Sequence, residues 1–256
     1  MAQRLLLKRW LRLASLLGLA SCAVYQPMQS AAPGVRDRGQ VEVTGGISSP
    51  QTQLSAGVNY SPVRHMLVRA AVAGIGDKDD STYRRNRQYE VAVGTYWPLG
   101  RHVLLGAMGG VGQAQSQVRY RVNYILSNGS LLREYDARYN KFFGEAYGLV
   151  QVVPGLDLGI AYRLTQVQFA SLTDRGQPLD LRGMLRSEPM VFLRHTYAPG
   201  PQRERLLYAQ VSIARSALLG ARPARSGSGP ADNLLESVSY FTVGLGFFPS
   251  ALFRRP

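Results

Sequence analysis

Apolar and polar residues alternate with a period of two along most of the chain after residue 39, and helix-type periodicity does not persist in that region. Between residues 156 and 165, for example, Leu158, Ile160 and Leu164 occupy one side of an extended chain, while Asp157 and Arg163 occupy the other. Such alternation predicts β-strands with one apolar and one polar face. We expect ten of them, at residues 40–47, 51–60, 66–75, 88–97, 102–119, 133–152, 156–169, 189–197, 205–214 and 236–248.

The connections between these strands, after the first, alternate between short and long. Residues 61–65, 98–101, 153–155 and 198–204 form the short links, and residues 76–87, 120–132, 170–188 and 215–235 form the long ones. Antiparallel hairpins with their tight turns at one end and their long loops at the other are typical of outer-membrane barrels. We therefore expect an all-β fold, a closed antiparallel up-and-down transmembrane β-barrel of about ten strands, with eight and twelve as the other even numbers that the pattern allows.

Aromatic residues mark strand ends that face the short links or the C-terminus. They are Tyr60, Trp97, Tyr197 and Phe247, and each lies on the apolar side of its strand. Amphipathic rings at one level around a barrel form a girdle where the membrane meets water. We expect these four residues to form such an interfacial girdle at one end of the barrel.

The polar sides of the strands would then face the barrel interior. This assigns Arg69, Glu90, Asp157, Arg163 and Arg194 to the lumen. Eight strands leave an interior just wide enough for side chains, whereas wide aqueous channels need about 16 strands. We expect these polar residues to fill a narrow lumen that passes small solutes at most.

The same alternation also fits a water-soluble protein in which the apolar faces meet in a dry core. In that alternative the chain is a periplasmic lipoprotein whose soluble β-barrel or sandwich binds a small apolar ligand. The direction of Leu158, Ile160 and Leu164 separates the two interpretations, because the barrel turns them toward lipid and the soluble protein turns them inward.

The first 21 residues have the organisation of a secretory signal peptide, with basic residues before an apolar run and small residues after it. The only cysteine of the chain, Cys22, follows directly. The tetrapeptide Leu19-Ala20-Ser21-Cys22 resembles the lipobox of bacterial lipoproteins. The resemblance implies that the chain is cut before Cys22, that its thiol receives diacylglycerol, and that the new N-terminus receives a further acyl chain such as palmitate.

These features divide the chain into a lipoprotein signal peptide at residues 1–21, a flexible tether at residues 22–38 and an outer-membrane β-barrel domain at residues 39–256. The tether is expected because prolines and a glycine interrupt residues 23–38. Ala23 follows the cysteine, and by the same resemblance the absence of aspartate there implies the outer membrane. We expect a protein of the bacterial outer membrane with both termini on the periplasmic side.

The chain carries a formal net charge of +14, which on its own would suggest an anionic partner. Nucleic acid is excluded because the basic residues are scattered and the signal peptide indicates export. Membrane lipids are the expected partners, including lipopolysaccharide through arginines of the outer loops such as Arg84, Arg85 and Arg87. The oligomeric state is left open by the sequence.

Candidate chemistry is sparse. His65, His102 and His195 are the only histidines, each at or near a predicted turn or strand end, and no pair of them has the spacing of metal ligands. A hydrolase needs an acidic residue or a serine beside its histidine, and His195-Thr196-Tyr197 offers no serine. We therefore expect a non-enzymatic envelope role, which is structural, a surface interaction or limited small-solute passage. We expect no catalytic residues, no metal and no cofactor apart from the covalent lipid on Cys22.

Overall fold

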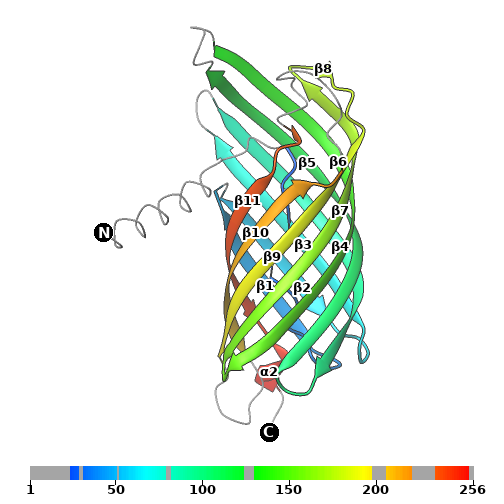
Figure 1. Ribbon diagram of the computed structural model, residues 1–256, viewed down its shortest axis with the longest axis vertical. Helices are drawn as coiled ribbons and strands as arrows, with labels where there is room; N and C mark the ends of the chain where they lie inside the picture. Colours follow the sequence, from blue (N-terminus) through cyan, green and yellow to red (C-terminus); the bar gives the residue numbers. More distant parts are fainter. Residues whose placement is uncertain are drawn as a thin grey trace, which may run out of the picture.

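The chain folds as a closed antiparallel β-barrel of ten strands, seen in a computed structural model that describes residues 24–28, 31–50, 52–78, 82–123, 130–197, 206–220 and 234–253 (Figure 1). The wall strands are β1 (Val41–Ser49), β2 (Gln53–Tyr60), β3 (Leu67–Lys78), β4 (Tyr83–Leu99), β5 (Val103–Asn123), β6 (Ser130–Val153), β7 (Leu156–Asp174), β9 (Gly183–Tyr197), β10 (Leu207–Leu218) and β11 (Val238–Phe247). The two-residue strand β8 (Gln177–Pro178) extends one end of β7, and the short helix α2 (Ser250–Phe253) follows β11.

The barrel closes where the first strand meets the last. β1 pairs with β11 in antiparallel register, with Gly45 opposite Leu245, and every other wall strand pairs with its sequence neighbours in the wall. Closure matters because an open edge in hydrocarbon would leave backbone groups without hydrogen-bond partners, at several kcal/mol per group. The predicted fold class is therefore confirmed, including the strand number of ten.

Several strands extend further toward the long links than the alternation predicted. β4 begins at Tyr83 rather than at residue 88, β7 ends at Asp174 rather than at residue 169, and β9 begins at Gly183 rather than at residue 189. Arg84, Arg85 and Arg87 consequently lie in β4 and not in a loop, which corrects their prediction as loop residues. These extensions carry polar residues on both faces, so the period-two hydrophobic signal is lost there although the backbone stays paired.

The rim at the long-link end is uneven. β5 and β6 have 21 and 24 residues, whereas β1 and β2 on the other side have 9 and 8. The longer strands stand well above the shorter ones in Figure 1. The opposite end, the short-link end, holds the tight turns and α2, so the C-terminal helix lies at the expected end of the barrel (Figure 1).

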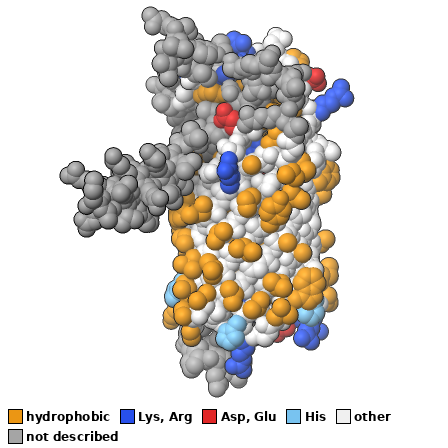
Figure 2. Space-filling view, in the orientation of Figure 1, with side chains coloured by type: hydrophobic (Ala, Val, Ile, Leu, Met, Phe, Trp, Pro, Cys, Tyr) orange, Lys and Arg blue, Asp and Glu red, His pale blue; other side chains and the backbone are white. Residues whose placement is uncertain are grey.

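Apolar side chains cover the outside of the wall. Leu158, Ile160 and Leu164 are 44%, 64% and 38% exposed, so they point outward as the barrel interpretation requires. Figure 2 shows hydrophobic side chains spread over the middle of the visible wall. The outward residues of this apolar belt include Val43, Ile47, Leu54, Val58, Val68, Val72, Val91, Val93, Leu105, Val111, Phe142, Val150, Val191, Leu193, Val211, Ile213, Val243 and Leu245. Within the described residues, no helix has both the length and the apolar composition to cross a membrane.

The predicted tether is not a tether over its described part. Residues 24–28 and 31–35 are buried within the barrel, and Val24, Ala32 and Val35 have no exposed surface. The prolines and glycine of this segment preclude regular secondary structure, but its apolar side chains fill space that ten strands leave between them. We call residues 24–28 and 31–35 the lumen segment. The signal peptide and Cys22 lie outside the described residues.

The lumen segment runs from the long-link end to the short-link end. Val24 belongs to a buried cluster with Tyr135, Leu172 and Leu234, which all lie toward the long links. Fifteen residues later the backbone N–H of Gly39 donates to Ser61 beside a short link, just before β1 begins. The described chain therefore starts at the end opposite α2, which differs from the expectation that both termini share the short-link end.

Candidate functional site: the occupied lumen

The upper part of the lumen segment is held through Tyr25. Its hydroxyl donates to Glu188 Oε1 at 2.7 Å, and its ring lies 5.9 Å from that of Tyr139. The same carboxylate accepts hydrogen bonds from Thr165 Oγ1 at 3.1 Å and from Ser216 Oγ at 2.9 Å. Glu188 is fully buried, and these three hydroxyl donors satisfy a charge that would otherwise be costly inside the barrel.

The guanidinium of Arg163 is the centre of a charged layer halfway down the lumen. Its Nε donates to Glu145 Oε2 at 2.7 Å, and its Nη1 lies 3.0 Å from Glu90 Oε2. Lys141 forms a second ion pair with Glu90. Arg163 Nη1 also donates to the backbone carbonyl of Met28 at 3.4 Å, so this wall network reaches the lumen segment.

The lower part of the segment is held by a carboxylate. Both oxygens of Glu42 lie 3.0 Å from the backbone nitrogen of Gly34, and they also accept from Asn59 Nδ2 at 2.8 Å and from the Tyr208 hydroxyl at 2.7 Å. A Cβ at position 34 would lie 2.8 Å from Arg194 Nη1 and 3.0 Å from Glu42 Oε1. A side chain at position 34 would therefore displace the ends of the Arg194 and Glu42 side chains.

Arg194 also binds the lower part of the lumen segment. Its guanidinium donates twice to Gln210 Oε1, at 3.1 and 2.7 Å, and once to the backbone carbonyl of Ala32. It also lies 4.1 Å from the ring centroid of Tyr208, within the range of a cation–π contact. Arginine suits this position since a single planar group can donate to a side chain and a backbone while stacking on a ring.

The structure places all five predicted lumen residues inside the barrel. Arg69, Glu90, Asp157, Arg163 and Arg194 are at most 4% exposed. Glu90 pairs with Arg163, and Arg194 holds the lumen segment, whereas Arg69 approaches Met108 Sδ at 3.9 Å and Asp157 accepts from Thr196 Oγ1 at 3.5 Å. The five predicted residues therefore do not form one site, since they are spread over several levels of the interior.

Among the described residues, seven buried ionic residues were missed by the sequence reasoning: Glu42, Arg133, Lys141, Glu145, Asp174, Arg186 and Glu188. Lys141 and Glu145 are an even number of residues apart in one strand, so the alternation rule could have assigned them together to the lumen. Glu188 precedes residue 189, where the expected strand began, and was therefore read as part of a loop. No sequence signal identifies the lumen segment as the partner of Glu42 and Glu188.

The four girdle candidates all lie at the short-link end of their strands. Tyr60, Trp97 and Tyr197 are 42%, 44% and 55% exposed, and Phe247 is half-buried. All four are on the outward face, in line with the apolar belt. Their common level is compatible with an interfacial girdle, which remains a prediction.

The histidines do not form a catalytic constellation in the described residues. His195 is exposed on β9, and His65 Nδ1 lies 2.7 Å from the backbone oxygen of Tyr96. Across the described parts of the chain, no group of three or more histidine, cysteine, aspartate or glutamate residues could hold a metal ion. The interior of the barrel instead binds a peptide segment by hydrogen bonds that involve hydroxyl, guanidinium and carboxylate groups.

No protein-family model and no curated protein matches the sequence. Among solved structures, the translocator domain of the autotransporter NalP from Neisseria meningitidis is similar over 96% of this chain and 95% of its own, at 11% identity and a TM-score of 0.44. The outer membrane protease OmpT from Escherichia coli is similar over 82% of this chain and 94% of its own, at 12% identity and a TM-score of 0.46. The NanC porin is similar over 81% of this chain and 98% of its own, at 13% identity and a TM-score of 0.35.

Proposed function

We propose that this chain is a lipid-anchored β-barrel of the bacterial outer membrane, closed by its own lumen segment and serving a non-enzymatic envelope role. The observation that carries the proposal is the apolar belt around a charged interior. A soluble protein that exposed this belt would leave many large apolar side chains in water, at roughly 25 cal/mol for each Å² of apolar surface. Acyl chains remove that cost, and the closed barrel leaves no backbone group unpaired in them.

The proposed orientation puts the short links in the periplasm and the long links outside, as in outer-membrane barrels generally. Under this orientation the apolar belt spans the bilayer and the tall part of the wall, from β4 to β7, projects outward. The aromatic residues of the short-link end would then lie at the periplasmic interface. C-terminal helix α2 would lie in the periplasm as well.

The lumen segment changes where the lipid on Cys22 would be. Val24 packs in the layer of Tyr139 and Val167, and the outward neighbours of this layer, Asn140 and Gln168, are polar and therefore beyond the apolar belt. A chain that enters the lumen there would carry its acyl groups on the outer side of the membrane. We therefore propose outer-leaflet anchoring, in place of the periplasmic anchoring expected from the sequence.

The segment passes close to the low side of the rim. Gln26 and Pro27 lie beside the turn between β1 and β2, at Ser49 and Pro50, and beside the start of β11. The strands on this side are short, so this part of the rim is close to the outer edge of the belt.

The proposed role has no catalytic step. The lumen segment and its charged partners occupy the interior, so solute passage through the closed form would be negligible. A role as a small-solute channel is the second candidate, and it requires the lumen segment to move. If the segment moved out, arginine, lysine and glutamate side chains would line the space that it leaves. The charged interior favours a channel only in that open form.

Extraction of the protein and of a Cys22→Ser variant tests the proposal. Both should need detergent for extraction from membranes, and both should migrate faster on a gel before heating than after it. Only the native protein should incorporate radioactive palmitate. Release of Cys22→Ser as a soluble folded domain would overturn the transmembrane assignment and establish a periplasmic lipoprotein. Lack of palmitate on the native protein would overturn the lipid anchor alone.

A further inference from the structure

The outward face of β4, β5 and β6 changes from apolar to cationic over three consecutive levels. The lowest level belongs to the apolar belt and consists of Val91, Val111 and Phe142, which lie opposite one another across the three strands. These residues are 51%, 47% and 46% exposed. They mark the outer limit of the belt on this side, because the next outward positions on all three strands are polar or amphipathic.

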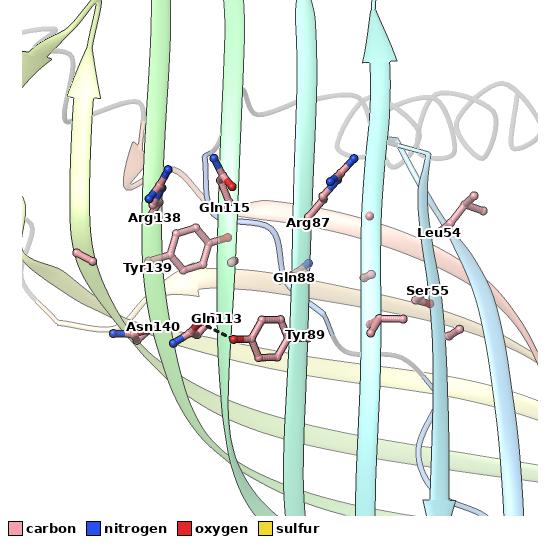
Figure 3. Close-up of a pocket in the computed structure, with 16 residues that line it drawn as sticks. Leu54, Ser55, Arg87, Gln88, Tyr89, Gln113, Gln115, Arg138, Tyr139 and Asn140 are labelled. Carbon is pink, nitrogen blue, oxygen red and sulfur yellow. Dashed lines mark hydrogen bonds between the residues drawn. The ribbon is translucent and has the colours of Figure 1, made fainter.

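The next level combines one ring with two amides. Tyr89, Gln113 and Asn140 are cross-strand neighbours, and the Tyr89 hydroxyl donates to Gln113 Oε1 at 2.5 Å (Figure 3). A tyrosine with an apolar body and a hydrogen-bonded hydroxyl is typical of the interface between acyl chains and headgroups.

The third level is the cationic one. Arg87 lies opposite Gln115 on β5, and Gln115 lies opposite Arg138 on β6, so two exposed arginines flank one amide (Figure 3). Adjacent strands are 4.7–4.9 Å apart, which puts the two arginine backbones about 10 Å from each other. We call Arg87, Gln115 and Arg138 the arginine row.

Neither arginine of the row makes an ion pair with any residue that the structure describes. The nearest carboxylates on these strands lie further out and are already engaged. Asp136 accepts from Gln117 Nε2 at 2.9 Å, and Glu134 accepts from the Tyr83 hydroxyl at 3.0 Å. The row therefore presents two positive charges two levels beyond the outer limit of the belt.

We propose that the arginine row binds a phosphate of a phosphorylated glycolipid in the outer leaflet, the lipid A type of headgroup. The proposal rests on the outer-membrane assignment above. Arginine presents planar pairs of N–H donors that match phosphate oxygens, and two of them on either side of Gln115 can share one anionic group. Lipid phosphates occur at this depth, directly outside the acyl chains.

The wall beneath the row fits an acyl chain. Gly109 on β5 and Gly144 on β6 are direct cross-strand neighbours on the outward face. A Cβ added at Gly144 would meet nothing within 4 Å, so the surface is recessed there. Val93 and Leu164 flank this glycine pair on β4 and β7. An acyl chain that descends from a headgroup at the arginine row would therefore lie in a shallow channel between apolar side chains.

The test measures binding of bisphosphorylated lipid A to the purified barrel by native mass spectrometry, with fully dephosphorylated lipid A and inorganic phosphate as the comparison ligands. The variant is Arg87→Ser with Arg138→Ser. The matched control is Arg64→Ser with Arg101→Ser, which removes the same charge from exposed positions at the short-link end. Migration before and after heating shows that each variant is folded as a barrel.

Loss of two charge-assisted contacts should weaken lipid A binding about 10- to 100-fold in the arginine-row variant, with no change in the control variant. Dephosphorylated lipid A should bind the native protein as weakly as lipid A binds the arginine-row variant, and inorganic phosphate should not compete at equal concentration. Unchanged lipid A binding by a heat-modifiable arginine-row variant would overturn the site. A native protein that is soluble without detergent would instead overturn the outer-membrane assignment.

Discussion

Replacing Arg163 with methionine tests whether the charged layer of the lumen stabilises the barrel. The guanidinium is 1% exposed and pairs with Glu90 and Glu145, and it also donates to the carbonyl of Met28. Glu90 would keep Lys141, but Glu145 would lose the only cation that pairs with it among the described residues. Leaving a buried charge without its partner costs about 3–5 kcal/mol, so the equilibrium constant for unfolding should rise by about two to four orders of magnitude.

The measurement is urea unfolding of the barrel in lipid vesicles, followed by the mobility of unheated samples on a gel. Combining Arg163→Met with Glu145→Gln should recover most of the lost stability, because removing both partners leaves no unpaired charge. The control is Arg215→Met, which removes an exposed arginine that donates to Ser237 Oγ at 3.1 Å and should change the free energy of unfolding by less than about 0.5 kcal/mol. A cost below about 1 kcal/mol for Arg163→Met would refute the reasoning, since it would mean that water reaches the layer and screens its charges.

Three further outcomes follow from the same structure. Ile160→Arg puts a charge in the middle of the apolar belt and should lower the free energy of unfolding in vesicles by about 2–4 kcal/mol; equal stability in that assay would contradict the lipid-facing assignment. Gly246→Ala puts a Cβ 2.0 Å from the Tyr208 ring and should cost about 1–3 kcal/mol, whereas Gly76→Ala, where a Cβ meets nothing within 4 Å, should be near neutral. Replacing residues 24–35 with a glycine–serine sequence of equal length should produce stepwise conductance in planar bilayers, whereas the native protein should show none. A variant without conductance would contradict the interpretation that the lumen segment closes the barrel.

The alternation of apolar and polar residues was sufficient to predict the barrel because the belt imposes it. Leu158 and Ile160 face lipid while Asp157 and Arg163 face the interior, and a strand between two such environments can only alternate. The same rule failed where both environments are polar, beyond the belt. Arg87 lies in a paired strand, but nothing in its neighbouring residues distinguishes that strand from a polar loop.

The lumen segment could not be predicted for a different reason. Its residues carry signals for the absence of helix and strand, and such signals are the same for a chain in solvent and a chain packed in a cavity. Val24, Tyr25 and Val35 are apolar enough to be buried, but burial of an irregular segment depends on partners far away in the sequence. Tyr25, for instance, donates to a carboxylate 163 residues away. Contacts at that separation are set by the closed barrel and leave no local pattern.

The polar interior and the lumen segment depend on each other. Arg163 and Arg194 each donate a hydrogen bond to a backbone carbonyl of the segment, at Met28 and Ala32, and the Glu42 carboxylate accepts from the backbone N–H of Gly34. Backbone carbonyl and N–H groups are fixed partners that carry no net charge, so they satisfy both the arginines and the carboxylate without adding an ion to the lumen. An empty lumen would expose these groups to one another or to water, whereas an apolar plug made of side chains alone would leave them unsatisfied. An irregular backbone is therefore the kind of occupant that such a lumen selects, because a helix or strand would already have used its own donors and acceptors. At position 34 a Cβ would lie 2.8 Å from Arg194 Nη1, so a side chain there would displace a guanidinium that binds the segment.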